Sequence, residues 1–163
     1  MEADEFDALY TIAFSRLVNQ LYALVGDREE ARDCVQEAFV RAWSRRRELD
    51  GSGSPEAWVR LTAYRLAVSR WRHTVRSRRS PDRALQPVRS EPPPDEARIE
   101  LMRALSQLPV EQRHALVLHH LCDLPVAEVA VVVRAPVGTV KARLSRGRAT
   151  LHSLLAEEGA RHV

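Results

Sequence analysis

The stretch Leu124–Leu155 decides the fold of this chain, and it reads LPVAEVAVVVRAPVGTVKARLSRGRATLHSLL. Its first part, about Val126 to Val133, is short and almost wholly apolar, which predicts a buried helix. Its second part starts near Val137 and carries one lysine and three arginines over two helical turns. A short buried helix followed by a longer basic one is typical of a helix-turn-helix, whose second helix enters the DNA major groove. The stretch therefore predicts a module that contacts duplex DNA.

The composition favours an all-α protein. The chain has 163 residues, of which 45% are hydrophobic, enough for one ordinary domain or two small helical ones. Glycine occurs only six times, and the alternation of β-branched residues that marks strands is absent. The 25 basic residues exceed the 22 acidic ones by only three, so the placement of the charges matters more than their sum. Lys141 is the only lysine; arginine suits phosphate and base recognition, although GC-rich coding explains much of so strong a bias.

Several classes of function are disfavoured by what the sequence lacks. Cys34 and Cys122 show no CxxC spacing, which favours a reducing compartment without disulfides. No apolar run approaches the ~18 residues of a membrane span, and the acidic start MEADEFD is no signal peptide. The GxSxG, Walker A and HExxH motifs are missing. We therefore expect a soluble, cytoplasmic protein that is not an enzyme, uses no cofactor and has no small-molecule substrate or membrane partner.

One cluster could suggest a metal site, because His119, His120, Cys122 and Asp123 lie close together near a predicted helix end. Adjacent histidines point in different directions on a helix, and no second pair of ligands has zinc-like spacing. A solvated helix end is the favoured interpretation, so no metal is expected.

Three helices are predicted before residue 80. The first covers residues 6–25, with inward apolar side chains at Phe6, Leu9, Ile12, Ala13, Leu17, Leu21 and Leu24. Gly26 fits the C-terminal end of that helix and Asp27 the N-cap of the next, which runs from about Arg28 to Glu48. Ser54 as N-cap and Pro55 at the first helical position open the third.

The third helix has two distinct faces. Its core stripe is predicted at Leu61, Tyr64, Val68, Trp71 and Val75. A second face combines an aromatic ring, hydroxyls and arginines at Trp58, Thr62, Arg65, Ser69, Arg72 and Arg76. Between Arg60 and Arg83, eight arginines meet a single acid. A solvated charged face usually mixes both signs, so a nucleic-acid surface is favoured over a merely solvated one.

A proline-rich segment divides the chain. Helical periodicity stops from residue 80 to 94, where five of the nine prolines lie, and this composition predicts a semi-extended linker. Helices return over residues 95–108 and 109–121, ahead of the helix-turn-helix. We therefore predict an all-α fold of two small helical domains, residues 1–79 and 95–163, joined by a linker over residues 80–94.

Four short motifs resemble those of bacterial sigma factors and follow the same order. Residues 33–43, DCVQEAFVRAW, resemble the DxVQExFxRxW signature of sigma region 2, and residues 108–113, LPVEQR, resemble the opening of sigma region 4. The segments EVA (128–130) and VGTVKAR (137–143) are similar to parts of the region 4 helix-turn-helix. Two such domains without an intervening region 3 form the layout of extracytoplasmic-function (ECF) sigma factors. Four motifs in order are far more specific than any one of them.

The resemblance implies a site for core RNA polymerase and one for the −10 promoter element. In the family, the region 2 helix docks on a coiled coil of the polymerase largest subunit, which implies polymerase-binding roles for Asp33, Gln36, Glu37, Val40 and Arg41. The third helix and the loop before it correspond to the part that melts the −10 element, which implies DNA contacts at Trp58, Thr62, Arg65, Ser69, Arg72 and Arg76. Aromatic and cationic side chains suit captured single-stranded bases. Arg65 and Ser69 stand where many members have asparagine and aspartate, so the family's base preference does not transfer.

The resemblance also implies that the last helix reads the −35 promoter element. The residues concerned are Gly138, Thr139, Lys141, Ala142, Arg143, Ser145, Arg146 and Arg148. Gly138 and Thr139 would open this helix, where backbone N–H groups favour phosphate. Arg134 stands where the family usually has a glycine with positive φ. It either costs up to about 1 kcal/mol of strain or marks a differently shaped turn, and its side chain could reach a phosphate.

These observations predict a sigma factor that binds core RNA polymerase and directs promoter-specific initiation of transcription. Because the family is commonly held inactive by anti-sigma factors, the resemblance admits such a partner, although no residue identifies one. The alternative is a helix-turn-helix regulator that acts without polymerase. It would bind its operator tightly alone, whereas free sigma factors usually bind promoters poorly.

Overall fold

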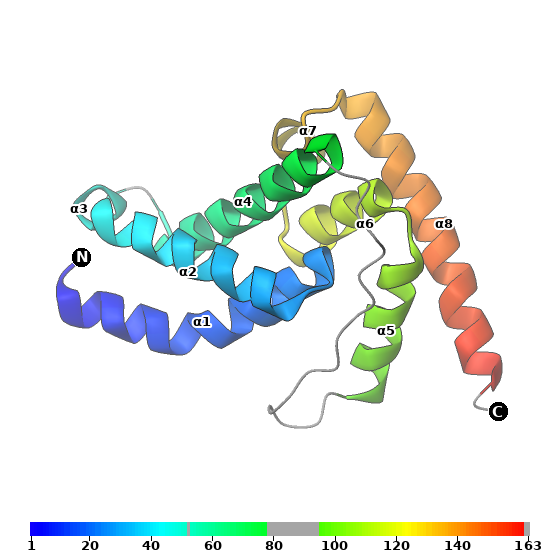
Figure 1. Cartoon of the computed structure of the whole chain (residues 1–163), viewed down its shortest axis with the longest axis horizontal. Helices are drawn as coiled ribbons and strands as arrows, with labels where there is room; N and C mark the ends of the chain where they lie inside the picture. Colours follow the sequence, from blue (N-terminus) through cyan, green and yellow to red (C-terminus); the bar gives the residue numbers. More distant parts are fainter. Residues whose placement is uncertain (52, 78–94, 162–163) are drawn as a thin grey trace. The chain divides into compact units, whose positions relative to one another are not determined.

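The computed structural model describes residues 1–51, 53–77 and 95–161, apart from the side chains of residues 76 and 77. All regular structure in these ranges is helical, as predicted (Figure 1). The described residues form two compact units, one on each side of residues 78–94. The predicted linker, residues 80–94, lies outside the described residues. No helix in the described ranges is both long and apolar enough to span a membrane.

The first unit comprises α1 (Ala3–Val25), α2 (Arg28–Ser44), α3 (Arg46–Leu49) and α4 (Pro55–Ser77), and α2 packs against both α1 and α4 (Figure 1). The predicted capping residues connect α1 to α2. Gly26 has φ 73°, and its N–H donates to the carbonyl of Tyr22 at 2.8 Å. The Asp27 carboxylate accepts from the backbone N–H groups of Glu29 and Glu30 at 3.0 and 3.2 Å. These caps satisfy helix-end groups and reverse the chain within two residues.

The core of the first unit is drawn from all three long helices. Its fully buried members include Leu17, Leu21 and Leu24 of α1, Cys34, Val35 and Ala38 of α2, and Val59, Tyr64 and Val68 of α4. Burial raises the pKa of the Cys34 thiol to about 11, so Cys34 is an inert part of this core at neutral pH.

Two residues expected in this core are exposed instead. Ile12 is 70% exposed and Val75 is 51% exposed, while Leu61 and Trp71 of the predicted stripe are only half-buried. The helix α4 buries small residues in their place, notably Ala63 at 1% and Ala67 at 2% exposure. Alanines let a neighbouring helix approach closely. The buried face of α4 is therefore rotated about the helix axis relative to the face predicted from the large apolar side chains.

The second helix is shorter than predicted. It ends at Ser44, and a separate single turn, α3, follows it. Arg45 leaves the helical conformation with φ −112°. The Arg46 guanidinium donates to the carbonyl of Trp43 at 3.1 Å, which adds a side-chain hydrogen bond to the backbone bonds at this helix end. The next helix begins as predicted, with the N–H of Ala57 donating to the Ser54 hydroxyl at 3.4 Å.

The second unit comprises α5 (Glu96–Gln107), α6 (Val110–Leu116), the π-helical turn η1 (Val117–Leu121), α7 (Val126–Val133) and α8 (Val137–Arg161). Helices α5, α6 and α7 all pack against α8. The bounds of α7 and the start of α8 are those expected from the sequence. Val140 and Leu144 of α8 are 0% and 1% exposed and fix the rotation of this helix.

Gly147 sets the distance between α6 and α8. A Cβ at this position would lie 3.0 Å from Leu116 Cδ1 and 3.4 Å from Gln112 Cβ. We expect Gly147→Val to lower the free energy of unfolding by about 1–3 kcal/mol through overpacking. Gly147→Ala should stay within about 1 kcal/mol of the parent, because the gain in helix propensity offsets the displacement of Leu116.

Chemical denaturation followed by circular dichroism measures this effect. Gly159→Val is the matched control, because Gly159 lies in the same helix and a Cβ there meets nothing within 4 Å. Equal loss of stability in the two valine variants would contradict the close packing of α8 on α6.

Candidate functional site

The five predicted polymerase-binding residues share one face of α2. Asp33, Gln36, Val40 and Arg41 are exposed, and Glu37 is half-buried among them. Val40 is 65% exposed, so an apolar side chain stands at the centre of a polar, helical face. Phe39 points the other way and is 3% exposed, as expected of a core residue. This face combines an apolar centre with a charged surround, which is the usual anatomy of a protein-binding surface.

Glu37 connects this face to α4 through two arginines. Its Oε1 accepts from Arg41 Nη2 at 2.5 Å, and its Oε2 accepts from Arg70 Nη2 at 2.7 Å. Partial burial alone would raise the pKa of Glu37, but the hydrogen bonds and charges of Arg41 and Arg70 outweigh it and lower that pKa. The contact with Arg70 has no local signal in the sequence, because Glu37 and Arg70 are 33 residues apart. One arginine of the basic third helix is thus engaged within the unit.

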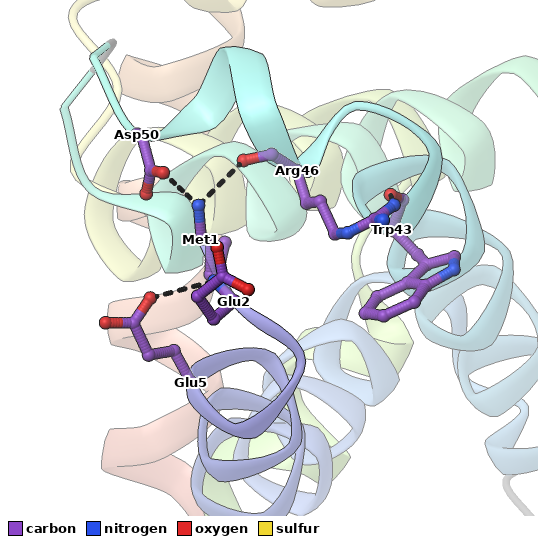
Figure 2. A network of polar contacts seen from close by, with 6 residues as sticks. All are labelled: Met1, Glu2, Glu5, Trp43, Arg46 and Asp50. Atoms are coloured by element: carbon purple, nitrogen blue, oxygen red, sulfur yellow. Dashed lines mark hydrogen bonds and ion pairs between the residues drawn. The ribbon is translucent and has the colours of Figure 1, made fainter.

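Trp43 lies at the end of the same face, with the Arg46 side chain extending toward its ring (Figure 2). The guanidinium carbon of Arg46 lies 4.2 Å from the centroid of the Trp43 ring, and Phe6 meets that ring edge-on with centroids 5.1 Å apart. The Met1 ammonium group forms an ion pair with Asp50 and donates to the Arg46 carbonyl. These contacts tie the start of α1 to α3 and fix Trp43, which remains 40% exposed.

The predicted −10 residues follow one side of α4. Arg65 and Ser69 are exposed, whereas Trp58, Thr62 and Arg72 are half-buried. The side chain of Arg76 lies outside the described part of the chain. At the start of this helix, Glu56 forms an ion pair with Arg16 of α1. The side therefore offers a partly covered aromatic ring next to accessible cationic and hydroxyl groups.

The predicted −35 residues lie in the first half of α8. Gly138, Thr139, Lys141, Ser145, Arg146 and Arg148 are exposed, whereas Ala142 and Arg143 are half-buried. Arg143 Nη2 lies 3.6 Å from Glu111 Oε2 of α6, which orients its side chain. Arg148 donates through Nε to the carbonyl of Leu144 at 3.2 Å. Because Val140, Leu144 and Gly147 are buried, the basic side chains occupy the outward side of the helix.

Arg134 takes the left-handed conformation that the family's glycine would take. Its φ and ψ are 53° and 51°. Its N–H donates to the carbonyl of Val131 at 3.4 Å, and the N–H of Ala135 donates to the carbonyl of Ala130 at 3.1 Å. These two bonds form a Schellman motif. A differently shaped turn is therefore excluded, and the chain tolerates the strain of a non-glycine residue at this position.

The histidine and cysteine side chains near η1 are engaged in closing that turn. His119 Nδ1 lies 2.7 Å from the carbonyl oxygen of Leu124, and the Cys122 thiol donates to the carbonyl of Val117 at 3.2 Å. Asp123 has φ 54°, a conformation that aspartate adopts more readily than most residues. Among the described residues, no group of three or more His, Cys, Asp or Glu side chains could hold a metal ion.

Comparison with known protein families places both units in the sigma-70 class. The model of sigma-70 region 2 matches residues 9–77, and the model of sigma-70 region 4 matches residues 98–151. The ECF RNA polymerase sigma factor SigC of Mycobacterium tuberculosis (strain CDC 1551 / Oshkosh) is 31% identical over 134 residues, covering 79% of this chain and 72% of the relative. The ECF sigma factor SigW of Bacillus subtilis (strain 168) is 28% identical over 176 residues, covering 96% and 91%.

Solved structures share the fold. The sigma factor RpoE of Bartonella quintana, in complex with the anti-sigma factor NepR, gives a TM-score of 0.67 at 22% identity and covers 94% of this chain and 98% of that one. CnrH, in complex with the cytosolic domain of CnrY, gives 0.57 at 25% identity and covers 96% and 90%.

The chain belongs to the ECF sigma factor family. It is a sigma factor that binds core RNA polymerase and directs promoter-specific initiation of transcription. The match to region 2 over residues 9–77 disfavours the alternative of a helix-turn-helix regulator that acts without polymerase. The family consists of initiation factors, which fits the expectation of a protein without catalytic activity.

Proposed function

We propose that promoter recognition is divided among three surfaces of this chain. Region 2 is assigned to residues 1–79, a linker to residues 80–94, and region 4 to residues 95–163. The α2 surface, made by Asp33, Gln36, Glu37, Val40 and Arg41, docks on core polymerase. Its support is the exposed Val40 among charged neighbours, with Glu37 held in place by two arginines.

The α4 surface captures the opened −10 element. Trp58 provides an aromatic platform, and Arg65, Arg72 and Arg76 provide cationic groups for the backbone of a single strand. Thr62 and Ser69 add hydroxyl groups along the same side of the helix. The proposal rests on the coincidence of these groups along one side of the helix, with Arg65 and Ser69 accessible.

The α8 surface binds the −35 element in the major groove. Lys141, Ala142, Ser145 and Arg146 face base edges, and Gly138, Thr139, Arg143 and Arg148 contact the phosphate backbone. The arrangement of buried and exposed side chains on α8 is the observation that carries the whole proposal. Burial of Val140, Leu144 and Gly147 against the unit leaves Lys141, Arg146 and Arg148 on the outward side.

The protein itself catalyses no reaction and acts in the cytoplasm as a dissociable polymerase subunit. We also infer that an anti-sigma factor is among its partners. Among solved structures of this fold, RpoE of Bartonella quintana is in complex with the anti-sigma factor NepR, and CnrH is in complex with the cytosolic domain of CnrY. Such a partner would compete with polymerase for the same surfaces.

Run-off transcription tests the proposal. With core polymerase purified from the source organism, the full chain should yield promoter-dependent transcripts from a pool of genomic fragments. Arg146→Ala should weaken holoenzyme binding to the selected duplexes by about tenfold, the effect of one base contact. Arg103→Ala, which removes an exposed arginine of α5, is the matched control. Absence of transcripts from every fragment would contradict the polymerase-dependent function, and equal effects of the two substitutions would contradict the α8 assignment.

A further inference from the structure

The turn before α8 contains a strained arginine with a free side chain. Arg134 is exposed and holds φ 53°. The Schellman hydrogen bonds to the carbonyls of Ala130 and Val131 hold this backbone conformation. The backbone of Arg134 therefore cannot relax to another region of φ and ψ. Among the residues that the structure describes, its guanidinium group makes no hydrogen bond or ion pair. Strained residues of this kind persist where the surroundings over-determine them, and they cluster at functional sites.

The charge around Arg134 indicates what it binds. No acidic residue occurs between Glu128 and Glu157, and this interval holds five lysines and arginines. One of the five, Arg143, is paired with Glu111, while Arg134, Lys141, Arg146 and Arg148 are exposed. The N-terminal end of α8, three residues after Arg134, adds the partial positive charge of a helix start. This part of the unit therefore favours an anionic partner over a protein surface of mixed charge.

We propose that Arg134 is a DNA-backbone contact, its guanidinium group binding a phosphate at the edge of the groove that α8 enters. This inference rests on the proposed −35 role of α8. The first residues of α8, Gly138 and Thr139, are assigned to the phosphate backbone, so Arg134, in the turn immediately before them, lies beside the same backbone. The planar guanidinium group matches the geometry of phosphate oxygens. The strain at Arg134 is thus retained for binding, where a glycine would give a relaxed turn without a contact.

The test compares stability with salt-dependent binding. Core polymerase with the full chain binds a duplex promoter fragment that the wild-type holoenzyme has selected from genomic DNA, at a series of salt concentrations. Arg134→Gly should keep or raise the melting temperature yet weaken binding by at least about tenfold, as for one charge-assisted contact. The slope of log K against log salt should fall in magnitude by about 0.9, the loss of one phosphate contact. Arg134→Lys should retain most of that slope, and Arg103→Ala should leave it unchanged.

Each other outcome has a distinct meaning. Unchanged affinity and slope in Arg134→Gly, together with weakened binding by Arg146→Ala, would overturn the phosphate contact and leave the α8 assignment standing. Weakened binding by both Arg134→Gly and Arg134→Lys with no change of slope would assign Arg134 a role in the shape of the turn and likewise overturn the contact. No effect of Arg146→Ala would refute the proposed −35 surface itself.

Discussion

Val40→Glu is expected to abolish transcription from promoters of this sigma factor by preventing its assembly with core polymerase. Val40 is 65% exposed at the centre of the α2 surface, so the substitution should not disturb the fold. A glutamate there would carry an unpaired charge into a desolvated contact. Loss of a central interface residue costs about 2 kcal/mol or more, which corresponds to at least about 30-fold in affinity. Size-exclusion chromatography of the mixture with core polymerase, or competition binding, measures the loss directly.

Ile12 supplies the matched control for this experiment. It is an equally exposed apolar residue, 70% exposed, on α1 of the same unit. Ile12→Glu introduces the same charge into the same unit but outside the α2 surface, so binding to core polymerase should stay within about twofold of wild type. Equal losses in the two variants would contradict the assignment of polymerase binding to α2. Loss of polymerase binding in Ile12→Glu alone would indicate that the docking surface lies on α1.

The sequence predicts some parts of this molecule well because the determinants are local. The bounds of α7 and the start of α8 follow from an apolar run bounded by Pro125 and Pro136. The turn between α1 and α2 follows from Gly26 and Asp27, whose caps involve residues no more than four positions away. The motifs of regions 2 and 4 are likewise continuous in sequence, and the family models match the same segments.

Features that depend on tertiary packing escape such reasoning. The large apolar residues of α4 predict one core face, but the packing of this helix buries Ala63 and Ala67 and leaves Val75 exposed. The pairing of Arg70 with Glu37 joins two helices and has no local signature. The conformation of Arg134 is an intermediate case. The sequence allows either a strained residue or a differently shaped turn at this position, and the backbone angles show the strained residue.

Trp58→Ala is expected to impair promoter opening more than promoter binding. Trp58 is half-buried at the start of α4, where its ring can stack on a base that has left the duplex. Stacking on an aromatic side chain is worth about 1–3 kcal/mol per base, so the yield of open complex should fall between about 5- and 150-fold. Permanganate footprinting of the −10 region measures opening, and filter binding on the same fragment measures association. Trp58→Phe should retain much of the opening activity, because it keeps an aromatic face.

A premelted template separates opening from binding. If Trp58 acts by capturing bases, a heteroduplex already unpaired over the −10 element should largely restore transcription to Trp58→Ala, because base capture no longer has to offset the cost of unpairing. Arg146→Ala should gain no comparable rescue, since its defect lies in contact with duplex DNA at the −35 element. Equal defects of Trp58→Ala on duplex and heteroduplex, with a melting temperature close to wild type, would show that Trp58 supports duplex binding instead. The two variants therefore test, in one assay, the proposed division between an opening surface on α4 and an anchoring surface on α8.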